Sequence, residues 1–155
     1  MNRIEELKIR TYRNKIYLLF DYLRIKKLYD PLDENYYDLY NKFRLIKKQV
    51  LQVFTFHING VINNELYESQ KKLAEKVFLD EIRILDLDDV FVTINYNGVN
   101  YWAEVGFNYL QQNLDRFSCD VNNNFFLLSD NFVIELYRNE YQWEVLKGET
   151  STNNS

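Results

Sequence analysis

The chain has 155 residues, of which 46% are hydrophobic and 27% are charged, so it is long enough for one well-buried core and short for two. With only 4 glycines it fits neither a phosphate-binding loop nor a dinucleotide fingerprint, and a single histidine and a single cysteine are too few for an ordinary zinc site. The net charge of -4 conceals an asymmetry, because residues 1–48 hold 12 Lys/Arg against 7 Asp/Glu (+5), whereas residues 49–155 hold 7 against 16 (-9).

The amino-acid usage and the N-terminus bear on the source and location of the protein. Asn, Tyr, Phe, Ile and Lys, whose codons are AT-rich, are frequent, while Gly, Ala and Pro are rare. This composition favours an AT-rich bacterium, its phage or another AT-rich genome as the source. The chain has no run of about 18 apolar residues, and its first residues lack the apolar stretch of a signal peptide. We therefore predict a cytoplasmic protein, in the host cytoplasm if it is viral, with no role at a membrane.

The N-terminal part, residues 1–86, is predicted to contain three helices. The first covers Ile4–Tyr29 and has two apolar stripes on roughly opposite sides. One stripe belongs in the core, and the other is expected either to pack within the same fold or to form a homodimer interface. The second helix begins at Asp30-Pro31, where an N-cap precedes a proline at the first helical position, and the third covers about residues 65–82.

The segment 53–62 admits two structures. Apolar residues at helical spacing extend the second helix to about Phe54, and we favour a helix that ends near Gly60. The alternative is a short hairpin around Asn59-Gly60. With that hairpin, the order helix, helix, hairpin, helix, meander resembles the NTF2-like cone folds. The resemblance implies a pocket for a small ligand. Small-ligand binding by an NTF2-like domain is therefore one of the alternative functions.

A β-hairpin is predicted over Val90–Phe107, around an Asn97-Gly98 dipeptide that suits a two-residue type I′ turn. Pairing Tyr96 with Val99 places eight apolar residues on one face of the hairpin. The opposite face has the mixed composition of a wet or partner-facing surface. Its residues are Phe91, Thr93, Asn95, Asn100, Trp102 and Glu104.

Alternating apolar residues predict two or three further antiparallel strands within 125–128 and 132–146. A turn at 139–140 would set Glu135 opposite Glu144, an unfavourable pair unless a cation lies nearby. Like the hairpin, these strands are predicted to have one apolar face and one more polar face.

Together the elements predict an α+β fold, in which three N-terminal helices pack on a C-terminal antiparallel β-sheet, a meander of four to six strands. The helical part covers 1–86 and the β part covers 88–148, within a single domain of residues 1–148. Residues 149–155 are polar and are predicted to form a disordered tail.

No residue pattern predicts catalysis or a cofactor. His57 and Cys119 are expected to be structural, because neither lies in a catalytic or metal-binding motif. The segment Asp86–Asp89 is expected to be a solvated connection rather than a metal site. Glutamates of the predicted sheet, among them Glu104 and Glu135, would act as an acid–base group only in a shared pocket. We therefore predict a protein that is not an enzyme and holds neither a metal ion nor a cofactor.

The leading hypothesis is a non-catalytic protein-binding protein that uses the outer face of the sheet. Aromatic anchors with acidic neighbours suit docking to a partner protein with a basic surface. Phage inhibitors of nucleases, and immunity proteins, often work in this way, so an inhibitor or an immunity or anti-defence factor is the favoured class. The predicted partner-binding residues are Phe91, Trp102, Glu104, Glu135, Tyr137 and Glu144.

The first alternative is a nucleic-acid-binding accessory protein that uses the basic N-terminal helices. Lys and Arg side chains there could contact phosphates, and the tyrosines between them could stack on bases. The sequence pI of about 5.1 and the acidic remainder of the chain oppose this hypothesis. Its predicted contact residues are Arg3, Arg10, Arg13, Arg24 and Lys27.

Overall fold

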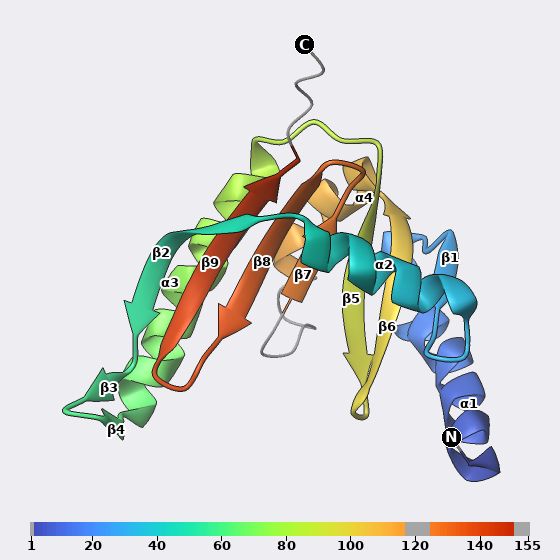
Figure 1. The fold of residues 1–155 in the computed structure, drawn as a ribbon, viewed down its shortest axis with the longest axis horizontal. Coiled ribbons are helices and arrows are strands. Elements are labelled where there is room, and N and C mark those ends of the chain that lie inside the picture. Colours follow the sequence, from blue (N-terminus) through green and yellow to red (C-terminus); the bar gives the residue numbers. More distant parts are fainter. Residues whose placement is uncertain (1, 117–124, 151–155) are drawn as a thin grey trace.

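The fold is built on one antiparallel sheet of seven strands, which carries helices on both faces (Figure 1). The structure is a computed structural model that describes residues 2–116 and 125–150. The strands follow the spatial order β1-β6-β5-β7-β8-β9-β2, and every neighbouring pair is antiparallel. They are β1 (Lys27–Tyr29), β2 (Lys48–Thr55), β5 (Asp89–Tyr96), β6 (Val99–Gly106), β7 (Phe125–Leu128), β8 (Phe132–Arg138) and β9 (Gln142–Glu149).

Helices cover the two faces of the sheet unequally (Figure 1). Among the helices whose bounds are described, α1, α3 and α4 bury apolar side chains such as Ile16, Phe78 and Leu110 against the face that carries Val92 and Ile134. Helix α2 lies across the opposite face. The α-helices are α1 (Arg3–Leu19), α2 (Glu34–Leu45), α3 (Asn64–Arg83) and α4 (Phe107–Gln112).

Side-chain caps mark where the three longer helices begin. Asn2, Asp33 and Asn63 precede α1, α2 and α3, and the side-chain oxygen of each accepts a hydrogen bond from a backbone N–H of the first turn. The predicted cap Asp30 lies three residues earlier and is buried before the helix starts. The second helix therefore begins at Glu34, later than the Asp30-Pro31 pattern indicates.

The predicted α+β class is confirmed, and so are the three helices in the N-terminal part. The register of the β5–β6 hairpin is also as predicted, with Tyr96 opposite Val99. Asn97 and Gly98 have φ values of 49° and 83°, as a type I′ turn requires. The apolar face of this hairpin forms the centre of the main core.

The first predicted helix is too long. α1 ends at Leu19, a short 3-10 helix follows at Asp21–Leu23, and Arg24 adopts a left-handed conformation with φ of 50°. The chain then forms β1, which pairs with β6 at one edge of the sheet. Long-range strand pairing has therefore replaced the helical pattern that continued to Tyr29.

The second predicted helix is also too long, and the hairpin alternative for 53–62 is correct. α2 ends at Leu45, and β2 forms the other edge of the sheet beside β9. The strands β3 (His57–Ile58) and β4 (Val61–Ile62) make a separate two-stranded hairpin, with φ of 50° at Asn59 and 79° at Gly60. The sheet has seven strands instead of four to six because β1 and β2 come from the part predicted to be helical.

The β8–β9 register differs by two residues from the prediction. Glu144 lies opposite Tyr137, and Glu135 lies opposite Leu146, so the two glutamates do not face each other directly. The side chain of Asn139 accepts hydrogen bonds of 3.0 Å from the backbone N–H groups of Tyr141 and Gln142, which centres the turn on residues 140–141. A two-residue shift keeps each side chain on its predicted face.

The end of β9 lies closer to the C-terminus than predicted. The strand continues to Glu149, and the backbone N–H of Thr150 still donates to the carbonyl oxygen of Asn131 at 2.8 Å. The rest of the predicted tail, 151–155, and the predicted structural residue Cys119 lie outside the described residues. Across the part of the chain that is described, no helix is both long enough and apolar enough to cross a membrane.

Candidate protein-binding surface

Helix α2 covers the middle of the outer face of the sheet and buries Trp102 completely (0% exposed). The indole ring lies 5.2 Å from the ring of Tyr40, 6.4 Å from Phe43 and 6.5 Å from Phe126, measured between centroids. The prediction that Trp102 stands on an exposed face is therefore wrong. The alternation of β6 is as expected, but a helix and not solvent lies above it.

Phe91 and Glu104 lie next to each other on β5 and β6, beside the short edge strand β1. Both are half-buried, and the Phe91 ring packs against Tyr29 at 6.0 Å. The strands β5 and β7 separate Glu104 from Glu135, a distance of three strand spacings or roughly 14 Å. The structure thus divides the six predicted partner-binding residues into two groups.

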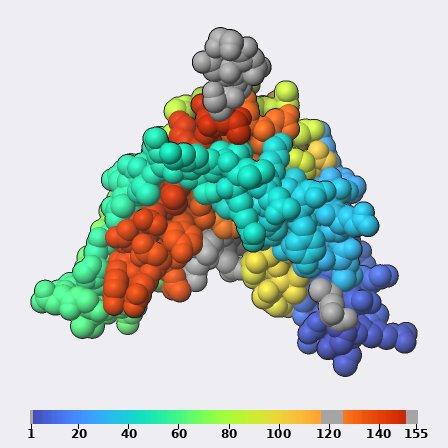
Figure 2. All heavy atoms as spheres, viewed as in Figure 1, coloured from blue at the N-terminus to red at the C-terminus, as the bar shows by residue number. Residues whose placement is uncertain are grey.

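The other three predicted residues are neighbours on the same face of the sheet beyond α2, where Tyr137 and Glu144 are partly exposed and Glu135 is buried. In one row across β2, β9 and β8, Val53 lies opposite Glu144, which lies opposite Tyr137. The next row joins Val50, Leu146 and Glu135 in the same way. Figure 2 shows this surface of β8 and β9 in orange and red, below the band formed by α2 and β2. We call it the open sheet face, and its residues are Val50, Val53, Glu135, Tyr137, Glu144 and Leu146.

Glu135 is the buried acid of the open sheet face, with 7% of its surface exposed. Burial raises the pKa of its carboxyl to about 7, Lys48 partly opposes this shift, and Glu144 adds to it. The Lys48 ammonium donates to the carbonyl oxygens of Phe43 (3.2 Å) and Ile46 (3.4 Å), at the C-terminal end of α2. The ammonium of Lys48 therefore interacts both with the carbonyl oxygens at the end of α2 and, electrostatically, with Glu135.

The carboxylates considered for acid–base chemistry do not line the pocket that adjoins the open sheet face. A pocket of about 650 Å³ touches the open sheet face through Tyr137, but Glu104, Glu135 and Glu144 do not line it. Among residues 2–116 and 125–150, no three His, Cys, Asp or Glu side chains are grouped as metal ligands. The pocket is lined by Phe56, Ile62, Asn64, Tyr67, Tyr137, Arg138, Asn139 and Glu140.

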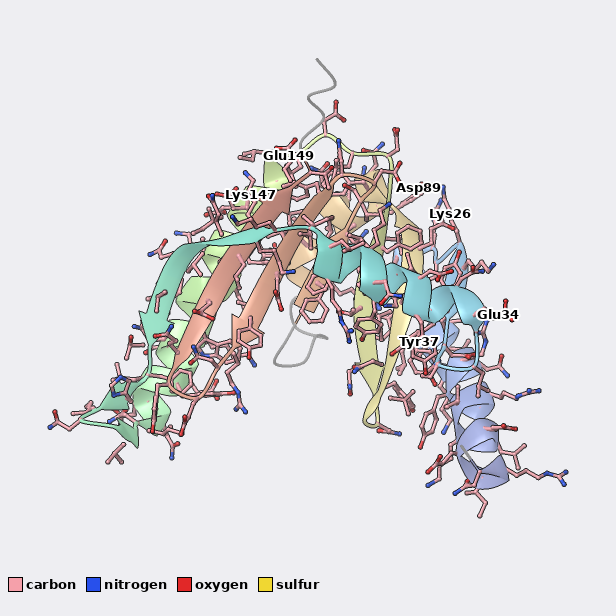
Figure 3. All side chains as sticks on the ribbon, viewed as in Figure 1. Lys26, Glu34, Tyr37, Asp89, Lys147 and Glu149 are labelled. Carbon is pink, nitrogen blue, oxygen red and sulfur yellow. The ribbon has the colours of Figure 1, made fainter. Side chains whose placement is uncertain are left out.

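His57 has a local role in the β3–β4 hairpin. Its Nδ1 atom accepts a hydrogen bond of 3.1 Å from the backbone N–H of Gly60, and its ring lies 5.0 Å from that of Tyr141. These contacts place the side chain in the turn that closes the hairpin. Asp89, from the acidic segment before β5, forms a 2.6 Å ion pair with Lys26 (Figure 3).

The predicted nucleic-acid residues do not form one patch. Arg3 and Arg10 are exposed on α1, which has 17 residues and is about 26 Å long, whereas Arg24 and Lys27 lie beyond its C-terminal end. Arg13 is held by Asp30 in an ion pair of 2.6 Å. The nucleic-acid role stays a prediction, because these five described residues do not lie together.

The other two predicted nucleic-acid residues, Arg24 and Lys27, each contact an aromatic ring. The guanidinium of Arg24 lies 4.4 Å from the ring centroid of Tyr109, and the ammonium of Lys27 lies 4.8 Å from that of Tyr29. The basic part of the chain (1–48) also contacts the acidic part (49–155) within one molecule, since Lys42 forms an ion pair with Asp130 at 3.2 Å. Part of the charge asymmetry is thus neutralised inside the fold.

Replacing Asp30 with alanine is expected to lower the free energy of unfolding by about 2 kcal/mol. Asp30 is buried, binds Arg13, and also accepts a hydrogen bond of 2.8 Å from the backbone N–H of Leu32. Urea unfolding should be compared with that of Asp89→Ala, which breaks the exposed pair with Lys26 and should lower the stability much less. Equal losses in the two variants would contradict a structural role for Asp30.

The sequence reasoning missed Val50, Val53 and Leu146 as members of the open sheet face. It assigned Val50 to a helix, which hid the fact that β2 extends the sheet beyond β9. The absence of Asp, Glu, Lys and Arg throughout residues 49–64 is a signal that could have revealed them.

Comparisons of the chain with protein-family models, with curated proteins and with solved structures gave no significant match.

Proposed function

We propose that this protein is a non-catalytic protein-binding protein whose open sheet face docks onto a partner with a basic surface. The observation that carries the proposal is the composition of the uncovered part of the sheet. Tyr137, Val50 and Val53 expose apolar surface there, and Glu144 lies between Tyr137 and Val53. A tyrosine supplies a large contact at low entropic cost, and an adjacent carboxylate selects a cationic partner.

The surroundings of Glu135 favour the same class of partner. An ionised carboxylate is costly to bury without a counter-charge, and Lys48 is already engaged with the end of α2. A Lys or Arg side chain from a partner would supply that counter-charge beside Glu135 and Glu144. An inhibitor or an immunity or anti-defence factor, working in the cytoplasm of an AT-rich bacterium or of its phage-infected host, remains the class of role we propose.

Reversing one charge of the open sheet face is expected to abolish partner capture. Immobilised wild-type protein and Glu144→Lys are incubated with lysate of the source cell, and retained proteins are identified by mass spectrometry. The variant should lose a basic protein that the wild type retains, with at least about a hundredfold weaker affinity once that protein is purified, because attraction has become repulsion. Tyr137→Ser should weaken the same interaction without changing charge.

The matched control is Glu68→Lys, which makes the same charge change on the exposed surface of α3. It should retain the partner as the wild type does, and circular dichroism should show that all three variants are folded. Equal loss of capture in Glu68→Lys and Glu144→Lys would mean that net charge alone is recognised. Retention of every bound protein by Glu144→Lys would refute the site.

A further inference from the structure

The strand β2 is a free edge of the sheet with little protection against pairing. It has eight residues, and among the described strands it pairs with β9 alone. The opposite edge strand, β1, has three residues, of which the first is Lys27, and Lys26 precedes it. Short strands and charged residues discourage edge-to-edge pairing. A bulge at Leu51 is the protective feature that β2 does carry, and it leaves an exposed leucine at the edge.

From Gln49 onward, β2 and the adjoining hairpin carry no formal charge, although Lys47, Lys147 and Glu149 border Leu51 at the beginning of the strand. Val50, Leu51 and Val53 are each more than 40% exposed, and the adjoining hairpin adds further aliphatic side chains. Residues 49–64 contain no Asp, Glu, Lys or Arg, in a chain of which 27% is charged. An exposed apolar patch of this kind on a folded chain marks an interface. The hairpin residues are Ile58, Val61 and Ile62, exposed by 53%, 69% and 51%.

We propose that β2 and the β3–β4 hairpin form the interface of a homodimer, in which β2 of one copy pairs antiparallel with β2 of the other. A second copy fits because residues 49–64 of the interface carry no charge, so these identical segments meet without like-charge repulsion. Antiparallel pairing of identical edge strands is self-complementary and closes as a two-fold dimer. The two sheets then become one continuous sheet across the interface.

The exposed stripe of α1 suits a second copy less well. Leu7 and Leu18 are 55% and 77% exposed, but Lys8 and Lys15 lie along one side of the stripe. Antiparallel packing of two α1 helices about Thr11 would bring Lys8 of one copy close to Lys15 of the other. Repulsion there opposes the homodimer through the first helix that the sequence allowed.

Pairing through β2 has a consequence for the open sheet face. A two-fold axis between antiparallel edge strands is perpendicular to the sheet, so the open sheet faces of both copies lie on the same side. A dimer would thus present two acidic surfaces in one direction. The dimer itself needs no partner protein, so its test is independent of the proposed function.

The test is the oligomeric state of the full-length protein, measured by sedimentation velocity over a wide concentration range. Wild-type protein should shift reversibly from monomer to dimer. Val53→Lys and Leu51→Lys should each raise the dimer dissociation constant by about thirtyfold or more, because two-fold symmetry places each substitution in the interface twice. Amide exchange of β2 in the wild type should slow as the concentration rises.

The control variant is Leu18→Lys, which changes the exposed stripe of α1 and should leave the dissociation constant unchanged. A wild-type protein that stays monomeric, with amide exchange in β2 independent of concentration, would overturn the proposal. A dimer that is lost in Leu18→Lys and kept in Val53→Lys would overturn it in favour of α1. The exchange measurement decides the question even if a lysine variant fails to fold.

Discussion

Replacing Trp102 with alanine is expected to lower the free energy of unfolding by about 3–5 kcal/mol, the largest loss of any substitution considered for this protein. The indole is fully buried between the sheet and α2, where Tyr40, Phe43 and Phe126 surround it. Its removal would leave a cavity that the rigid sheet cannot close, and α2 would lose its central contact. Partner capture by this variant would therefore report on folding and not on recognition.

Two other variants separate this packing role from alternatives. Trp102→Phe keeps an aromatic ring and should lose much less stability, because the buried indole N–H has no hydrogen-bond partner among the described residues. Tyr37→Ala changes an exposed side chain of the same helix (Figure 3) and should alter the unfolding free energy by less than about 1 kcal/mol. Urea unfolding of the three variants gives these values. An unchanged stability in Trp102→Ala would mean that α2 does not cover this face.

The hairpin β5–β6 could be predicted in full because local rules determine it. Asn97-Gly98 supplies the two positive φ values, and the apolar alternation on both sides allows one register with a single buried face. The turn of β8–β9 was misplaced because the side chain of Asn139 binds the backbone two and three residues later. Alternation alone does not distinguish registers that differ by two.

The two edge strands could not be predicted because their residues also fit a helical period. Ile46, Val50 and Phe54 are each four residues apart, as on one side of a helix, yet the chain leaves α2 at Leu45. Strand formation there depends on β9, which lies about 90 residues later in the sequence. A local pattern carries no information about such a pairing.

Three of the six residues of the open sheet face could be predicted from the sequence, for a related reason. Glu135, Tyr137 and Glu144 were placed on the right face because face depends on alternation within each strand. Which part of that face α2 would cover depends on tertiary packing, so Trp102 was placed with them although it is buried. The distinction matters for function, because the covered aromatic residues stabilise the fold and the uncovered ones are available to a partner.

Replacing Glu135 with glutamine is expected to stabilise the protein at alkaline pH by up to about 3 kcal/mol. Burial raises the pKa of the Glu135 carboxyl from 4.5 to about 7 in the folded state. Between these two values the folded protein holds a proton that the unfolded chain releases, so rising pH favours unfolding through this window. Glutamine keeps the shape of the side chain and cannot ionise, which removes this contribution.

The measurement is urea unfolding of the wild type and Glu135→Gln at intervals from pH 4 to pH 8. The difference in unfolding free energy should grow in favour of the variant as the pH rises through the window and level off above about pH 7. Glu68→Gln removes a charge from the exposed surface of α3 and controls for the change in net charge. Lys48→Met removes the cation that lowers the folded-state pKa of Glu135, so it should extend the upper end of the window to higher pH. A difference that is constant with pH would contradict a buried, proton-binding Glu135, and with it one of the reasons for expecting a cationic partner at the open sheet face.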